Sequence, residues 1–152
     1  MEQEQKKMLD AQLFFQEVTE MVKSRRKDIG RVPATMFVLT NDVNEDGGRT
    51  VCVAELPETP FTENTIQFAM SVVQYQKAKT QFLESVKEDG HDIAAIFYCE
   101  TQDIDGVETL MTGMQFDDNV ATRYYKVKES TLKVNEDGEL KSRITFTESE
   151  VG

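Results

Sequence analysis

The pattern closest to a metal site consists of Asp42, Asn44 and Asp46, which alternate along the chain and are followed by Gly47. This is how a calcium-binding EF-hand loop begins, with oxygen ligands at every second position. The match then fails, because the twelfth position of such a loop is Val53, where a bidentate glutamate is required. Both flanks also have the composition of strands, so a polar hairpin turn is the favoured interpretation.

Histidine chemistry is limited to one residue, His91, which is followed by Asp92 as in the His-Asp dipeptide of metal-dependent phosphohydrolases. Such sites need further histidines, and a Ser-His or Cys-His nucleophile would have to use this same residue as its base. The chain has no Gly-x-Ser-x-Gly elbow, and its Gly47-Gly48 pair opens a predicted strand rather than the helix of a P-loop. We therefore predict no catalytic site, metal or cofactor, although carboxylates alone can catalyse some reactions.

The two cysteines, Cys52 and Cys99, match neither a disulfide framework nor a zinc-ligand spacing. Strand-forming residues flank both of them, so they are expected to be buried thiols that pack as small apolar side chains. No apolar segment follows the first charged residues, as it would in a secretory signal. A cytoplasmic protein is expected.

The charge is strongly acidic, with 28 acidic against 17 basic residues and a net charge of -11 over 152 residues. Phosphate contacts need clustered Lys and Arg, so direct nucleic-acid binding is not expected. Residues 91–120 contain seven carboxylates and no Lys or Arg. Four of these carboxylates, in two predicted turns, form a candidate acidic partner patch: Asp103, Asp105, Asp117 and Asp118.

Four interpretations of this acidic segment stay open. It can serve solubility, dock onto a basic partner, imitate the phosphates of a nucleic acid, or, more weakly, bind a divalent cation. A second candidate surface is basic and lies at the C-terminal end of the first predicted helix and just after it: Lys23, Arg25, Arg26, Lys27 and Arg31. It suits an anionic partner, but compensation of the helix dipole together with local ion pairs is favoured.

Two amphipathic helices are predicted. The first spans about residues 3–28 and has apolar residues at helical spacing: Leu13, Phe14, Val18, Met21 and Val22. The second spans about residues 63–87, with Asn64 and Gln67 able to cap its start. Its apolar stripe is wide, which suggests a helix that lies across a sheet.

The remaining segments have strand character. Residues 34–40 and 50–55 form a predicted hairpin, and further strands are expected near 92–100, 107–116, 120–134 and 140–146. The predicted fold is a single α+β domain over residues 1–152, with a flexible tail at about 148–152. Its antiparallel sheet has about five to six strands, two helices pack on one face, and the element order is α-β-β-α-β-β-β(-β). No apolar run approaches the roughly 20 residues that a bilayer requires, so no membrane partner is expected.

The leading functional hypothesis is a non-catalytic module that acts through protein contacts, including self-association into a homo-oligomer. Two helices carry more apolar surface than one sheet face covers, and Phe14, Phe15 and Met21 are the candidate oligomer contact. One alternative is an acidic inhibitor or sequestering protein of phage or mobile-element type that mimics a nucleic acid. Another is a small-ligand binder or carboxylate-based hydrolase.

Overall fold

The computed structural model describes residues 2–57, 64–133 and 140–149, and within them the chain forms helices α1 and α2 and strands β1 to β6. The elements are α1 (Glu2–Ile29), β1 (Thr35–Val43), β2 (Arg49–Glu55), α2 (Thr65–Glu88), β3 (Ile93–Ile104), β4 (Val107–Phe116), β5 (Asn119–Lys133) and β6 (Leu140–Ser149). The predicted α+β class and element order are confirmed. The predicted tail at about 148–152 lies mostly outside the described residues, and β6 includes its first two positions.

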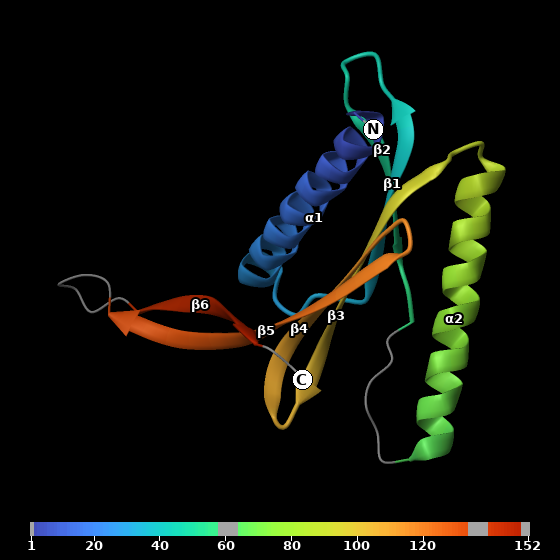
Figure 1. The fold of residues 1–152 in the computed structure, drawn as a ribbon. Helices are drawn as coiled ribbons and strands as arrows, with labels where there is room; N and C mark the ends of the chain where they lie inside the picture. Colours follow the sequence, from blue (N-terminus) through green and yellow to red (C-terminus); the bar gives the residue numbers. More distant parts are fainter. Residues whose placement is uncertain (1, 58–63, 134–139, 150–152) are drawn as a thin grey trace.

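All six described strands form one antiparallel sheet in the order β2-β1-β3-β4-β5-β6. The first hairpin pairs Val38 with Cys52, and after α2 the chain returns on the other side of β1, so that Val38 also lies opposite Ile96 of β3. The strands from β3 to β6 then follow one another as a meander. The sheet therefore places β1 and β3 in its interior, and the two helices lie on either side of them (Figure 1).

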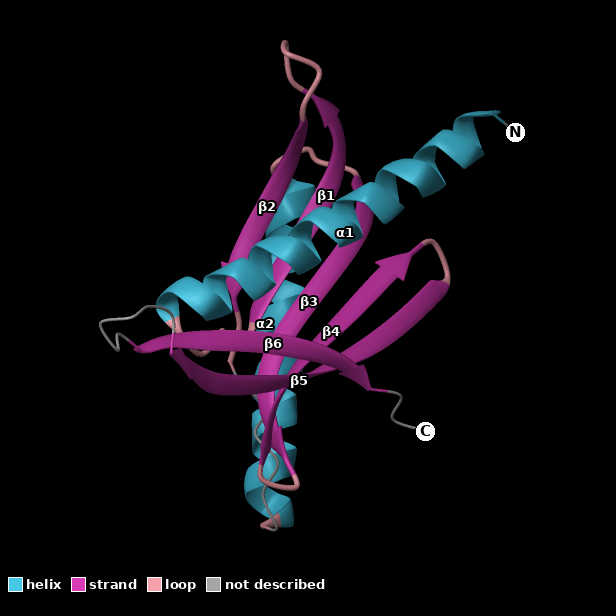
Figure 2. Ribbon diagram, turned by 90° about the vertical axis from the view of Figure 1, so that its left-hand side faces the viewer, coloured by secondary structure: helices cyan, strands magenta, loops and turns pink. Residues whose placement is uncertain are grey.

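The helices lie on opposite faces of the sheet, which corrects the prediction that both pack on one face (Figures 1 and 2). Phe37 and Leu39 of β1 belong to the apolar cluster beneath α1, whereas Met36 and Val38 belong to the cluster beneath α2. Neighbouring strand residues point to opposite faces, so a strand that is apolar at consecutive positions needs cover on both sides.

Helix α1 packs closely on the sheet through residues at helical spacing, namely Ala11, Phe14, Val18 and Val22, all of which are buried. Two residues of the predicted apolar stripe, Leu13 and Met21, are exposed instead. One residue is about 100° around a helix, so Leu13 is turned away from the sheet when its neighbour Phe14 faces it.

The helix ends follow local chemistry, and the predicted limits are confirmed to within two residues. Asn64 caps α2, because its side-chain oxygen accepts the backbone N–H groups of Ile66 and Gln67, each at 3.1 Å. Gly30 after α1 and Gly90 after α2 have φ of 105° and 88°, a backbone region that glycine adopts without steric cost. Within the described residues, neither helix is both long and apolar enough to cross a membrane.

Candidate functional site

The predicted acidic patch is not one surface. Asp103 and Asp105 lie at the turn between β3 and β4, whereas Asp117 and Asp118 lie at the turn between β4 and β5. These turns are at opposite ends of the ten-residue strand β4, which is about 30 Å long at the usual rise per strand residue. The four carboxylates therefore cannot share a metal ion or imitate one run of phosphates.

The basic patch at the end of α1 is largely occupied by partners within the chain. Arg26 forms two hydrogen bonds with Glu108, at 2.5 Å and 3.1 Å, and the guanidinium of Arg31 approaches the carboxylate of Asp103 at 3.3 Å. The hydrogen bond to Glu108 is the main reason that the pKa of Arg26 is raised above its ordinary value. Both acidic partners come from the segment 91–120, so the basic and acidic parts of the sequence meet and neutralise each other in part.

The other members of this patch have different surroundings. The Lys23 ammonium lies 4.3 Å from the centre of the Tyr125 ring, and that of Lys27 lies 5.9 Å from the Phe146 ring. These cation–π contacts join α1 to the β5–β6 hairpin. Arg25 is exposed. The patch thus holds the end of α1 against the sheet. The ion pair of Lys23 with Glu20 is local, whereas those of Arg26 with Glu108 and of Arg31 with Asp103 join residues distant in the sequence.

The calcium-like segment forms the hairpin turn between β1 and β2. The Thr50 hydroxyl donates to the side-chain oxygen of Asn44, and the Gly48 N–H donates to a carboxylate oxygen of Asp46. His91, which follows α2, contacts the carboxylate of Asp42. Across the described ranges, no three His, Cys, Asp or Glu side chains gather in a way that could hold a metal ion.

The two cysteines differ in exposure. Cys99 is fully buried beneath α1, and burial raises the pKa of its thiol to about 12. Such a thiol stays protonated at neutral pH and packs as a small apolar group. Cys52 is partly exposed on β2. Neither setting resembles that of a nucleophilic cysteine.

The residues predicted as an oligomer contact on α1 are only partly at the surface. Phe14 is buried in the core, and Phe15 packs partly buried beside it, with ring centroids 5.7 Å apart. Met21 remains exposed. The large side chain at the centre of the predicted contact is therefore not available to a second chain.

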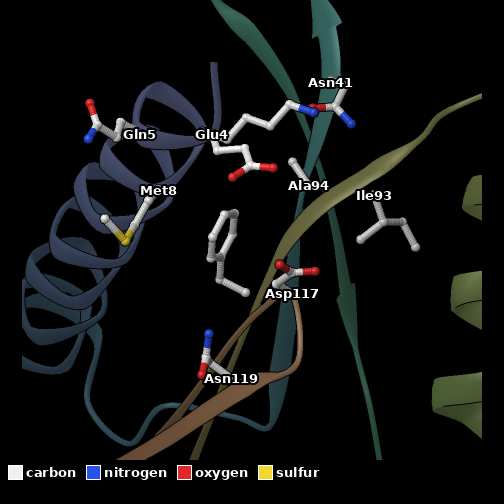
Figure 3. A pocket seen from close by; sticks show the side chains of 10 residues that line it. Glu4, Gln5, Met8, Asn41, Ile93, Ala94, Asp117 and Asn119 are labelled. Carbon is white, nitrogen blue, oxygen red and sulfur yellow. The ribbon is translucent and has the colours of Figure 1, made fainter. Parts of the chain in front are cut away.

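A hollow of about 690 Å³ lies between the N-terminal turns of α1 and the β4–β5 turn. Figure 3 shows the Glu4 and Asp117 side chains directed into it, with Met8 on one wall and Asn119 on another. The described lining offers carboxylates, amides, apolar groups and the Lys7 ammonium. This hollow has room for a small molecule.

The most distinctive surface is the outer side of α2. No charged residue occurs from Thr65 to Gln76, in a chain of which 30% of residues are charged. Ile66, Met70 and Val73 are 72%, 59% and 65% exposed, at the i, i+4, i+7 spacing of one helix face. Exposed apolar side chains gathered in this way mark interaction surfaces more often than scattered ones do.

This outer face lies opposite the side of α2 that packs on the sheet. Tyr75 and Phe82 contact the apolar cluster beneath α2, and each follows a residue of the exposed stripe by nine positions. Nine residues are about two and a half helical turns, so Ile66 and Tyr75 point in opposite directions, as do Val73 and Phe82. The wide stripe seen in the sequence is therefore two separate apolar faces.

A shallow groove runs along the outer face, lined by Thr65, Ile66, Ala69, Met70, Val73 and Gln74. We call these six residues the α2 groove. Ala69 is the smallest of them and leaves the hollow next to the long Met70 side chain. Sequence reasoning missed this surface, although the uncharged run from Thr65 to Gln76 was a usable signal.

The chain matches no protein-family model, no curated protein and no solved structure.

Proposed function

We propose that the protein is a non-catalytic assembly module that self-associates through the α2 groove, with two copies of α2 packed antiparallel. The observation that carries this proposal is the symmetry of the groove. In an antiparallel pair centred between Ala69 and Met70, Ile66 of one copy lies opposite Val73 of the other. Thr65 then lies opposite Gln74, and every residue of the groove has a partner from the same set.

The sizes of the side chains in the α2 groove suit this antiparallel pairing. At the centre, each Met70 side chain lies over the small Ala69 of the other copy, a large residue against a small one, as in well-packed helix pairs. The two-fold axis makes the same patch serve both copies, which is the commonest arrangement of homodimers. Polar Thr65 and Gln74 at the two ends can exchange hydrogen bonds without bringing charge into the contact.

Electrostatics favour this face for contact between copies. Each chain carries a net charge of -11, so two copies repel each other over most approaches. The α2 groove brings no carboxylate against another, because the segment from Thr65 to Gln76 has no charged side chain. A second copy therefore meets the least repulsion where the exposed apolar surface is greatest.

The expected association is reversible and weak. Standard stable interfaces bury about 800 Å² per partner, and two to three turns of one helix provide less than that. Dimers should therefore form in the micromolar range of concentration and increase with ionic strength, which screens the repulsion between copies.

Sedimentation velocity over a concentration series tests the proposal. Met70→Glu places two carboxylates near the two-fold axis, where like charges cost several kcal/mol, and should weaken association by about 100-fold or more. Leu13→Glu is the matched control, because Leu13 is a similarly exposed apolar residue on the outer side of α1. It makes the same change in net charge and should leave association nearly unchanged.

An equal loss of association in both variants would refute the proposed contact, since net charge alone would then explain it. A wild-type chain that remains monomeric at millimolar concentration would refute self-association altogether.

A further inference from the structure

The space between α2 and the sheet contains a pocket of about 250 Å³ that the assembly hypothesis does not use. Its walls come from β1, β3, β4, β5 and the inner side of α2. The lining includes Tyr75, Lys79, Tyr98, Glu100, Met111 and Gly113. The volume is below the range of about 300–1,000 Å³ that suits drug-sized ligands, so an occupant would be smaller than these.

The unusual member of this lining is Glu100, whose residue is only 1% exposed. It lies on β3, and Met111 of β4 is its neighbour across the sheet. One carboxylate oxygen accepts the Tyr98 hydroxyl at 2.8 Å and the Gln102 amide at 3.5 Å. Burying a carboxylate costs free energy that an apolar residue at this position would avoid.

Two tyrosine rings stand next to this carboxylate. The Tyr75 and Tyr98 rings meet edge to face with centroids 5.1 Å apart. Burial, followed by the nearby Glu100 charge, raises the pKa of both hydroxyls. Both tyrosines therefore stay neutral, and their electron-rich ring faces attract cations.

Gly113 keeps the pocket open. A Cβ atom placed on this residue would meet no other atom within 4 Å. Most residues at a central strand position would project a side chain into this space. Glycine in a strand interior is also a sign of close approach by another group.

We propose that this pocket binds a small organic amine, with the ammonium group at Glu100 and the apolar body against the tyrosine rings and Met111. The ammonium donates a hydrogen bond to the carboxylate of Glu100, which belongs to the pocket lining. The charge-assisted hydrogen bond gives preference for a cation, and the apolar walls give preference for a hydrophobic body.

This site is independent of self-association. The pocket contacts Tyr75 and Lys79 on the inner side of α2, whereas the α2 groove is on the outer side. The Met70→Glu variant should therefore bind the amine as the wild-type chain does.

The test is a titration of the full chain with 2-phenylethylamine, followed in two-dimensional amide NMR spectra at neutral pH. Shifts should concentrate at Tyr98, Glu100, Met111 and Gly113. The neutral analogue 2-phenylethanol has the same shape and should bind about tenfold or more weakly, because it lacks the charge-assisted hydrogen bond. The proposal is wrong if the amine shifts none of these signals at millimolar concentration, or if the alcohol binds equally well.

Two variants distinguish the contribution of the Glu100 charge from that of the open volume beside Gly113. Glu100→Gln keeps the shape and should abolish the preference for amine over alcohol, whereas Gly113→Leu fills the pocket and should abolish binding of both. Lys79→Met removes a cation from the lining and should strengthen amine binding. An amine preference that persists in Glu100→Gln, or binding that persists in Gly113→Leu, would overturn the proposal.

Discussion

At the scale of single residues, the pair of Arg26 and Glu108 joins α1 to the sheet. Its two hydrogen bonds are largely shielded from water, with the Arg26 side chain 12% exposed. Glu108→Gln should lower the free energy of unfolding by about 1–2 kcal/mol, because it removes the charge partner of a half-buried guanidinium. Urea denaturation measures this change.

The matched control is Asp103→Asn, which makes the same chemical change in the exposed pair with Arg31. Exposed ion pairs contribute about 0–1 kcal/mol, so this variant should lose clearly less stability than Glu108→Gln. Equal losses would mean that burial does not strengthen the Arg26 pair.

A second prediction at the scale of single residues is that the folded state loses stability at alkaline pH. Burial raises the pKa of the Cys99 thiol from 9.0 to about 12 and also raises that of the Tyr98 hydroxyl. Above pH 9 the unfolded chain loses these protons before the folded chain does, so stability should fall as the pH rises from 9 to 12. Below pH 9 these groups should cause no change.

Thermal unfolding measured between pH 8 and pH 11 checks this expectation. Tyr98→Phe should show a flatter decline than the wild-type chain, because it lacks the buried hydroxyl whose pKa is raised. A decline in Tyr98→Phe as steep as that of the wild type would contradict a role for the buried hydroxyl.

At the scale of the elements, the two ends of α2 differ in how much of their side-chain surface is buried. Among the described residues of α2, only Val86, near the C-terminal end, is buried. The N-terminal turn is stabilised by the Asn64 cap. Asn64→Ala should lower stability by about 1 kcal/mol, the usual effect of losing such a cap, and should also weaken self-association because Ile66 is in the frayed turn. Circular dichroism and sedimentation together check both parts.

The control is Asn64→Ser, which keeps a capping oxygen and should retain both stability and association. If Asn64→Ala lost stability without any change in association, Ile66 would not be part of the contact.

Sequence patterns predicted the elements well because their causes are local. The Asn64 cap, the glycines after each helix and the Asp105-Gly106 turn act within a few residues, and the predicted limits agree with the structure. The side of the sheet on which each helix packs depends on contacts between distant strands, and this was predicted wrongly. The continuous apolar run of β1 was a signal that both faces are covered.

The candidate sites were predicted less well for the same reason. Asp103 and Asp117 are close in the sequence but at opposite ends of β4, and only the pairing of the strands separates them. Nothing in the sequence distinguished Glu100 from the many other acidic residues. Glu100 lies beneath α2, near Tyr75 and Lys79, and this contact between distant segments is not encoded by the residues around Glu100.

At the scale of the whole molecule, the net charge of -11 is distributed unevenly over the surface. Acidic residues near the β3–β4 hairpin meet the basic end of α1, through Arg26 with Glu108 and Arg31 with Asp103. The outer side of α2 is left without charge from Thr65 to Gln76. Two copies that repel elsewhere can therefore approach along this helix.

The most direct test of the central claim is disulfide cross-linking with Ile66→Cys and Val73→Cys combined in one chain, in a Cys52→Ser background. In the antiparallel pair these residues lie opposite each other, so mild oxidation should give a covalent dimer. Within one helix they are about 10 Å apart along the axis, too far for a disulfide. Each single variant should form no covalent dimer, since in the antiparallel pair its two introduced thiols, one from each copy, are about 10 Å apart along the helix axis. Failure of the double variant to cross-link, or equally fast cross-linking of a single variant, would contradict antiparallel association through the α2 groove.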